Sequence, residues 1–259
     1  MISFIVSAYN EEANIAATVT TIQAAARDAG VDALDIVLVN DGSTDRTGQI
    51  VEELREQLHF IQTIHHPVNK GIGYTIRNGI AAARGEQFIL VPGDNDMSRE
   101  FLRLMLSHRY DADMVVSVPI NHEIRSLLRN MLSVLYRLAY MVGFRVYLNY
   151  FNGSCIYHTD KVRNLSIVSR GPSIIAEINT KLLRAGCTYC EIPGYFQTGS
   201  KPGRMLTFRN LLEVARTYLR LLMEVHVLRR SEFHGVSRRV YIDLSPMRTA
   251  TPLRTAGMK

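Results

Sequence analysis

Residues 37–48 read VLVNDGSTDRTG, and they combine the end of an apolar run with two carboxylates and several small hydroxyl side chains. The apolar part is typical of a buried strand. Asp41 and Asp45 follow where such a strand would end. One explanation is that these side chains cap the helix that follows the strand. The other is that the carboxylates belong to a ligand site at the carboxyl end of a sheet. The two explanations differ in whether other strands of the chain end in the same way.

Strand-like and helical segments alternate through the first 120 residues. We expect strands at 2–9, 35–39, 60–64, 87–91 and 113–118, and helices at 14–29, 45–58, 73–83 and 100–108. This alternation predicts an α/β fold with βαβ units and a mostly parallel sheet flanked by helices. Ligands of such sheets bind at the carboxyl ends of the strands. Polar clusters fall at three of those ends, at residues 9–12, 40–45 and 94–96.

Composition and net charge indicate the size of the domain and the kind of partner that the protein binds. The chain has 259 residues, of which 47% are apolar and 21% charged, and this is enough for one large domain with a real core. Lys and Arg exceed Asp and Glu by six. This mild excess favours anionic partners such as phosphates or a membrane surface, and we do not expect nucleic acid among them.

The three cysteines argue against a disulfide framework. Cys187 and Cys190 form a lone C-x-x-C, which is either a zinc half-site, a redox pair or two neighbours on a strand. Reduced thiols and a cytoplasmic location are the default. The start of the chain, residues 1–12, reads as a first strand rather than a signal peptide, and no stretch of 18 apolar residues free of charge predicts a transmembrane helix.

Asp94, Asn95 and Asp96 follow an apolar strand and the break Pro92-Gly93. Two carboxylates two residues apart on a turn can both reach one hard cation. Mg²⁺ or Mn²⁺ prefers oxygen ligands and keeps coordination sites open for substrate phosphates. A D-x-D sequence is also ordinary turn chemistry. Its place at a strand end, with two other acidic strand ends upstream, favours the metal site.

The segment 69–73, Asn-Lys-Gly-Ile-Gly, precedes a helix that carries Arg77. Glycines let a backbone approach a ligand closely, and a helix N-terminus favours phosphate. Lys70 and Arg77 add positive charge. The alternative is a plain loop with a glycine at the helix start, and the spacing is not the dinucleotide fingerprint G-x-G-x-x-G.

The second half of the chain is organised differently. We expect a helix at 174–185, a strand at 187–192, an amphipathic helix at 207–230 and a basic, loosely ordered tail at 231–259. Residues 123–148 and 207–230 are apolar but carry too many arginines to span a bilayer. They are either interfacial helices whose arginines meet anionic head groups, or core-packing helices with snorkelling arginines.

Four segments together resemble the family 2 glycosyltransferases with a GT-A fold, which is Rossmann-like. They are SAYNEEANI (7–15), VLVNDGSTDRT (37–47), NKGIGYTIRNGIAAARGE (69–86) and ILVPGDNDMS (89–98). Within the family, the chain resembles the dolichyl- or polyprenyl-phosphate sugar synthases. Arg125, Arg129 and Ser133 look similar to a pattern of that branch, and so do NYFNGSCIYH (149–158) and EIPGYFQTGSKPGR (191–204).

The resemblance implies a role for each matching position. Tyr9, Glu11 and Asp41 match residues that contact the base and ribose of a nucleotide, and Asp94 and Asp96 match the motif that binds metal and diphosphate. The nucleotide-sugar site implied in this way comprises Ala8, Tyr9, Glu11, Asp41, Lys70, Arg77, Asp94 and Asn95. The implied acceptor or phosphate site comprises Arg125, Arg129, Ser133, Lys201 and Arg204.

Two positions depart from the family pattern. Ala8 stands where a proline is usual. The branch often has Gly-Ser-Arg after its fifth strand, whereas here Ser117-Val118-Pro119 lacks the arginine.

The resemblance further implies a reaction. A sugar would pass with inversion from a UDP- or GDP-linked donor, aided by Mg²⁺ or Mn²⁺, to a polyprenyl phosphate at the cytoplasmic face of a membrane. A lipid phosphate is anionic at pH 7 and needs no general base. The alternative acceptor is a hydroxyl of a glycan or glycolipid, for which Glu177 would be the catalytic base beside Asp96. Glu177 is otherwise a first-turn helix residue that favours the helix dipole.

The sequence predicts a chain organised in three parts. We expect a GT-A domain over 1–206, with a nucleotide-sugar-binding half (1–120) and an acceptor half (121–206), followed by the helix and the tail. Two further classes remain open. A nucleotidyltransferase would need a glycine-rich basic loop directly after the first strand, which residues 7–11 lack, and a non-catalytic membrane scaffold would not need Asp94 and Asp96.

Overall fold

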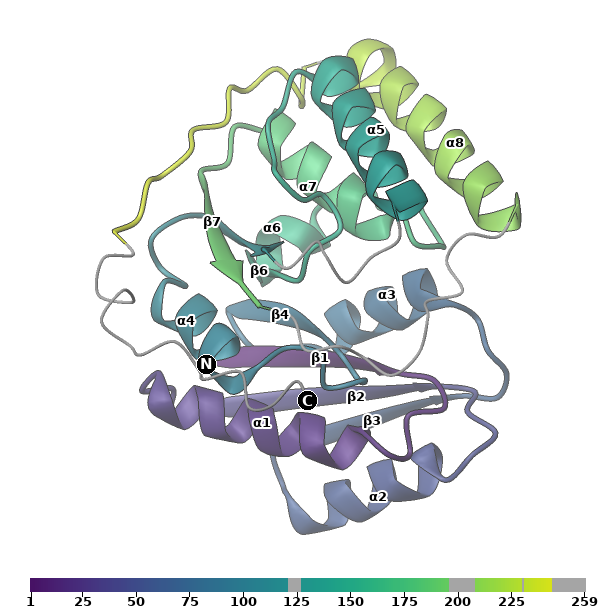
Figure 1. Ribbon diagram of the computed structural model, residues 1–259, viewed down its shortest axis with the longest axis vertical. Coiled ribbons are helices and arrows are strands. Elements are labelled where there is room, and N and C mark those ends of the chain that lie inside the picture. Colours follow the sequence, from purple (N-terminus) through teal and green to yellow (C-terminus); the bar gives the residue numbers. More distant parts are fainter. Residues whose placement is uncertain (121–126, 196–207, 230, 244–259) are drawn as a thin grey trace, which may run out of the picture.

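The computed structural model describes residues 1–120, 127–195, 208–229 and 231–243. Figure 1 shows a central sheet with helices on both faces, and a pair of long helices, α5 and α8, side by side at one end.

The first half alternates strands and helices as the sequence predicts. In chain order the elements are β1 (Ile2–Ala8), α1 (Ile15–Asp28), β2 (Leu34–Asp41), α2 (Thr47–Gln57), β3 (Ile61–His66), α3 (Ile72–Ala82), β4 (Gln87–Pro92), α4 (Arg99–Ser107) and β5 (Met114–Pro119). The cap of α4 illustrates why these boundaries fall where they do. Ser98 accepts a hydrogen bond from the Phe101 N–H, so a small hydroxyl starts the helix directly after the Asp94–Asp96 turn.

The second half contributes fewer strands. It comprises α5 (Leu127–Phe144), β6 (Cys155–His158), α6 (Thr159–Arg163), α7 (Ile174–Arg184), β7 (Tyr189–Gly194), α8 (Phe208–Met223) and a π-helical turn, η2 (Glu224–Leu228). The predicted helix at 174–185 and strand at 187–192 match α7 and β7 closely.

The seven strands form one sheet in the order β3-β2-β1-β4-β6-β5-β7. Every pair is parallel except those of β6, which runs antiparallel to both β4 and β5. The prediction of a mostly parallel sheet flanked by helices is therefore confirmed. The sequence analysis did not predict β6, because four residues make too short a periodic signal and its partners lie far away in the chain.

Two apolar layers cover the two faces of the sheet. Successive residues of a strand point to opposite faces, so Phe4 packs with α1, α2 and α4, whereas Ile5 packs with α3, α5 and α7. Both residues are almost fully buried. Because each face is covered, the polar side chains at the strand ends are the part of the sheet that a ligand can reach.

The described part of the tail expected at 231–259 contacts β7. The backbone of Val240 donates to the Tyr189 oxygen at 2.7 Å, and Tyr189 donates to the Arg238 oxygen at 3.0 Å. Phe233 is buried, and the Arg239 guanidinium pairs with Glu191 at 3.0 Å. Residues 231–243 belong to no helix or strand, although these contacts hold part of them beside β7. Residues 244–259 lie outside the described part, so the loosely ordered tail stays a prediction.

The helix predicted at 207–230 corresponds to α8 and η2. Glu213 and Glu224, which lie on the charged side of this amphipathic helix, turn toward the protein, and Glu224 is only 8% exposed. Leu219 and Met223 are exposed instead. Hydrogen-bond and ion-pair partners inside the fold, described below, explain why the carboxylates face inward. Within the described residues, no helix is both long and apolar enough to cross a membrane.

Candidate active site

A cavity of about 830 Å³ opens at the carboxyl ends of β1, β2 and β4. The first half of the chain supplies one wall, from the strand ends and the start of α3. The second half supplies the other wall, from the loop before α7 and from α8. A cavity between the strand ends and a second wall is the usual place for a ligand in an α/β protein.

Six of the residues predicted from the nucleotide-sugar pattern line this cavity. They are Ala8, Tyr9, Glu11, Asp41, Lys70 and Asp94. Asn95 and Asp96 are half-buried in the turn beside it, and Arg77 is exposed on α3; none of these three lines the cavity. The three polar strand ends that the sequence analysis singled out therefore meet at one edge of the sheet.

Asp41 and Asp45, the two carboxylates at and after the end of β2, have different surroundings. Asp45 accepts from the Thr47 N–H at 3.0 Å and from the Glu12 N–H at 3.3 Å, so it ties the loop after β1 to the start of α2. Desolvation opposes this ionised state, yet the hydrogen bonds from Thr47 prevail and lower the pKa of Asp45. Asp41 instead lines the cavity. One carboxylate of the polar cluster therefore supports the start of a helix, and the other lies at the cavity.

Asp41 organises the loop that carries Lys70. Its carboxylate accepts from the backbone N–H groups of Lys70 at 2.9 Å and Gly71 at 2.8 Å, and it lies 2.6 Å from Nδ1 of His66. The side chain is buried. Gly71 has a φ of 90°, a conformation that favours glycine, so this loop depends on both the glycine and the carboxylate.

The turn of Asp94, Asn95 and Asp96 is held against the end of β1. The Gly93 N–H donates to the Ser7 oxygen at 2.9 Å, and a Cβ on Gly93 would lie only 2.7 Å from that oxygen. Asn95 adopts a φ of 57°, and the Asp96 N–H donates to Asp94 at 3.3 Å. The turn thus places Asp94 at the cavity and Asp96 half-buried beside it.

These residues fit a divalent cation that takes its other ligands from a substrate. Asp94 and Asp96 supply oxygen ligands, and Oδ1 of Asn95 between them is buried without a hydrogen-bond donor in the described part of the chain. No cluster of three or more His, Cys, Asp or Glu side chains suited to a metal occurs among the described residues. A site with so few protein ligands suits Mg²⁺ or Mn²⁺, since these ions are often held by one or two carboxylates plus substrate phosphates.

The second wall was not predicted from the sequence. It consists of Arg170, Gly171 and Pro172 before α7, and Asn210 and Glu213 on α8. None of these five residues belongs to a motif that the sequence analysis singled out. Only the inward orientation of α8 brings Glu213 to the cavity, and a helical periodicity does not determine which face of an amphipathic helix will be covered.

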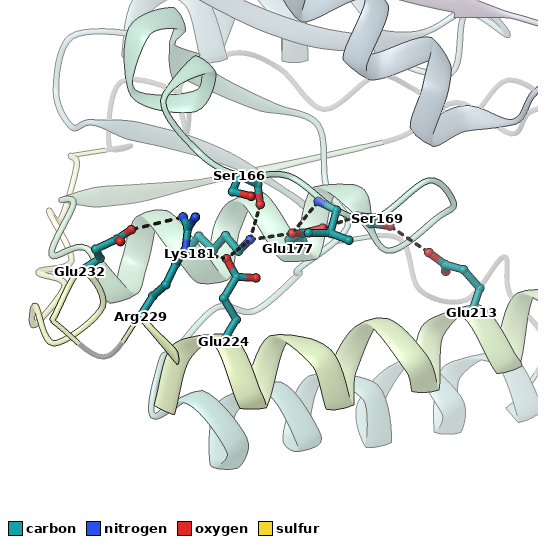
Figure 2. Close-up of polar contacts among 9 residues, drawn as sticks. Ser166, Ser169, Glu177, Lys181, Glu213, Glu224, Arg229 and Glu232 are labelled. Atoms are coloured by element: carbon teal, nitrogen blue, oxygen red, sulfur yellow. Dashed lines mark hydrogen bonds and ion pairs between the residues drawn. The ribbon is translucent and has the colours of Figure 1, made fainter. Parts of the chain in front are cut away.

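Glu177 lies away from this cavity, in a buried ion-pair network (Figure 2). Its carboxylate accepts from the N–H groups of Val168 at 3.0 Å and Ser169 at 2.7 Å, and it pairs with Nζ of Lys181 at 2.7 Å. Lys181 is fully buried and also pairs with Glu224 at 2.9 Å. The role of general base expected for Glu177 therefore has no support from the geometry, because its oxygens are occupied and do not face the cavity.

The predicted acceptor residues fall mostly outside the described residues. The described part of the chain does not include Arg125, Lys201 and Arg204. The Arg129 side chain also lies outside it. Ser133 is half-buried on α5 and is not one of the residues that line the cavity.

The cysteines are buried free thiols. Burial raises the pKa of Cys155 and of Cys190 to about 12 in each case, and burial also raises the pKa of Cys187. Neutral buried thiols make poor nucleophiles and poor metal ligands. Of the three explanations for the C-x-x-C, neighbours at the start of a strand fit the structure best.

The sequence of the chain is similar to a family model and to several known proteins. The sequence model of the family described as "Glycosyl transferase family 2" matches residues 3–162. The putative glycosyltransferase EpsH of Bacillus subtilis is 31% identical over 116 residues, which is 44% of this chain and 32% of EpsH. The dolichyl-phosphate beta-glucosyltransferase ALG5D of Trichomonas vaginalis is 36% identical over 97 residues, which is 36% of this chain and 30% of that protein. The chain thus matches about a third of the length of these relatives.

Solved structures share the fold at low sequence identity. Glucosyl-3-phosphoglycerate synthase from Mycobacterium tuberculosis, solved with Mn²⁺, UDP and phosphoglyceric acid, has a TM-score of 0.60 and 18% identity, covering 86% of this chain and 78% of that chain. TarS of S. aureus with UDP-GlcNAc has a TM-score of 0.59 and 18% identity, covering 89% and 69%. The mannosyltransferase PcManGT from Pyrobaculum calidifontis with GDP-Man and Mn²⁺ has a TM-score of 0.60 and 16% identity, covering 85% and 64%. These are GT-A neighbours, which confirms the predicted fold.

Proposed function

Since the chain belongs to glycosyl transferase family 2, we propose that it is a metal-dependent, inverting glycosyltransferase. It would move a sugar from a UDP- or GDP-linked donor to a polyprenyl phosphate at the cytoplasmic face of a membrane. The observation that carries the proposal is the cavity at the strand ends, in which Tyr9, Glu11, Asp41, Lys70 and Asp94 meet.

The nucleotide end of the donor would lie against the ends of β1 and β2. Tyr9 is 44% exposed and offers a ring face and a hydroxyl, and Glu11 and Asp41 offer carboxylates to ribose hydroxyls. Two of the GT-A neighbours were solved with Mn²⁺ together with UDP or a GDP-sugar, which supports the same class of donor for this chain.

The diphosphate would lie between Asp94 and Lys70. Asp94 and Asp96 would hold Mg²⁺ or Mn²⁺, which when bound neutralises negative charge that develops on the leaving nucleoside diphosphate. Lys70 adds a second positive charge on the same cavity wall. A cation held by Asp94 and Asp96 and the Lys70 ammonium would together stabilise the charge of the leaving group.

A phosphate acceptor does not require a general base at the cavity. A lipid phosphate is ionised at neutral pH and attacks without a general base, and Glu177 is buried in its ion-pair network rather than at the cavity. Attack on the face of the anomeric carbon opposite the leaving group gives inversion. A relative named as a dolichyl-phosphate beta-glucosyltransferase supports this class of acceptor.

An exposed apolar surface supports attachment to a membrane. We call it the α5–α8 surface, and it comprises Met131, Val134, Leu135, Leu138, Val142, Leu211, Leu212, Leu219, Met223, Val227 and Leu228. The Tyr218 hydroxyl donates to the Ala139 oxygen at 2.9 Å, so the two helices are packed together and present these side chains jointly. Monomeric proteins rarely expose apolar side chains in such a group unless the surface meets a partner or a bilayer.

Release of the nucleoside diphosphate tests the proposal. Purified protein would be incubated with Mn²⁺ and UDP- or GDP-sugars, with and without a short polyprenyl phosphate. We expect release that requires both the metal and the lipid phosphate. Release that is indifferent to the lipid phosphate would favour the hydroxyl acceptor, and absence of both release and nucleotide binding would refute the enzymatic function.

A further inference from the structure

Arg170 carries an unmatched positive charge on the second wall of the cavity. Among the described residues, Lys70 and Arg170 are the two cations that line it. The Arg170 side chain is exposed, and no carboxylate in the described part of the chain forms an ion pair with it. Its guanidinium lies 5.8 Å from the ring centroid of Tyr74, near the outer limit of a cation–π contact. Its N–H donors are therefore available to a ligand.

Carboxylates hold residues on both sides of Arg170 in the sequence, and Figure 2 shows Glu177 and Glu213 at Ser169. On one side, Glu177 accepts from the N–H groups of Val168 and Ser169. On both sides, Glu213 accepts from hydroxyls, from Ser169 at 2.8 Å and from Ser173 at 3.0 Å. The loop before α7 is thus held by two acidic side chains that come from two different helices.

Close backbone packing fixes the same loop from α3 and α8. A Cβ on Gly73 would collide with the carbonyl group of Arg170, and a Cβ on Gly171 would lie 2.7 Å from the Glu213 carboxyl carbon. Neither space admits a larger side chain without a shift. The main chain at Arg170 is therefore fixed, while its charged end remains free at the cavity.

We propose that Arg170 binds a phosphate group of a substrate in this cavity. The inference rests on the proposed function, which requires phosphates on donor and acceptor. Glu11, Asp41, Asp94 and Glu213 line the same cavity and repel an anion unless cations offset them. A guanidinium on a fixed backbone suits phosphate, because it presents parallel donors and loses little freedom on binding. The phosphate comes either from the donor diphosphate or from the acceptor.

Binding measurements on matched variants test the inference. Arg170→Ala removes the cation, Arg170→Lys keeps the charge without the paired donors, and Arg27→Ala removes an exposed arginine of α1 that does not line the cavity. Calorimetry with UDP and GDP plus Mn²⁺, each compared with its nucleoside, measures the donor phosphate contact. The KM for a short polyprenyl phosphate measures the acceptor contact.

We expect Arg170→Ala to weaken one phosphate ligand by roughly 10- to 100-fold, with Arg170→Lys intermediate and Arg27→Ala unchanged. Weaker diphosphate binding with unchanged nucleoside binding assigns the contact to the donor, and a raised KM for the lipid phosphate assigns it to the acceptor. If neither value changes in an active protein, or if Arg27→Ala has the same effect, Arg170 is a solvated surface residue and the inference is wrong. A wild-type protein that binds no nucleotide and no lipid phosphate would overturn the proposed function and this inference together.

Discussion

Lys181 shows what a single residue contributes when its charge is removed from water. It is fully buried, pairs with Glu177 and Glu224, and donates to the Ser166 oxygen at 2.6 Å. Its carboxylate partners bring α7 and η2 together around one ammonium group. Breaking a buried ion pair leaves uncompensated charge, so the network couples the C-terminal helix to the loop that carries Arg170.

Lys181→Met should destabilise the protein by about 3–5 kcal/mol, since two buried carboxylates would lose their counter-ion. The matched control is Lys161→Met, because Lys161 is 44% exposed and pairs with Asp113. An exposed pair of this kind contributes about 0–1 kcal/mol. Urea unfolding measures both values, and equal destabilisation of the two variants would contradict the structural role given to Lys181.

Under the proposed function, Asp94→Asn should reduce nucleoside diphosphate release by roughly 100-fold or more, because it would remove a carboxylate ligand of the cation that stabilises the leaving group. Asp28→Asn is the control, since Asp28 is an α1 carboxylate paired with Arg99 and does not line the cavity. Initial rates at saturating donor and Mn²⁺ separate the two. Full activity of Asp94→Asn would exclude Asp94 from metal binding.

Single residues also mark where sequence reasoning reached its limit. Asp94 could be predicted as a cavity residue because its motif follows the carboxyl end of a strand, which is where ligands bind in parallel sheets. Glu177 could not be placed, because a glutamate four residues before a lysine is typical of an exposed helical pair, whereas here both side chains are buried. Glu224, the second carboxylate that pairs with Lys181, lies 47 positions further along the chain than Glu177, and no local pattern links the two.

At the scale of elements, α3 is the helix on which both halves of the cavity meet. Its first turn follows the Lys70 loop, and Gly73 in that turn contacts the backbone of Arg170. A side chain at this position would push the second wall away from the first. The width of the cavity therefore depends on the absence of one methyl group.

Gly73→Ala should lower activity more than it lowers stability, because the added Cβ collides with the Arg170 carbonyl group. Gly30→Ala is the control: Gly30 has a φ of 63° and open space around it, so that variant costs about 1 kcal/mol through backbone strain alone and should retain activity. Thermal unfolding and initial rates measured on both variants distinguish the two effects. Retained activity in Gly73→Ala would show that the loop accommodates the methyl group.

Elements with strong local patterns were predicted well, and elements defined by partners were not. The strands and helices of the first half follow from alternation and from polar strand ends, and α7 and β7 follow from periodicity and the Pro193-Gly194 break. The antiparallel β6 and the ordered segment 231–243 depend on distant partners, β4 and β5 for the former and β7 for the latter. Long-range pairing of this kind leaves little trace in a short sequence window.

At the scale of the whole molecule, the α5–α8 surface and the cavity share one helix. α8 carries Glu213 and Asn210 toward the cavity and Leu219 and Met223 toward solvent. A bilayer that receives the apolar side chains would therefore lie against the element that also forms the second wall. This arrangement suits an acceptor whose phosphate reaches the cavity while its chain stays in lipid.

Val142→Asp should reduce co-sedimentation with anionic phospholipid vesicles by roughly ten-fold, because a charge would replace an exposed apolar side chain of the α5–α8 surface. Val142 is 79% exposed, so the fold should tolerate the change. Val236→Asp is the control, since Val236 is 88% exposed in the segment beside β7. Equal vesicle binding by wild type and Val142→Asp would argue that this surface meets a protein partner instead.

The antiparallel strand β6 also determines when the sheet can be completed during synthesis. β5 pairs with β6 and β7, and both of these partners follow it in the chain. As the chain leaves the ribosome, β2, β3 and β4 each find one sheet neighbour already made, whereas β5 emerges with its buried Val115 and Val116 and must wait for its partners. The interval before Cys155 appears is therefore the stage at which the nascent chain is most exposed to misfolding, and at which a chaperone would find an unpaired apolar strand to hold.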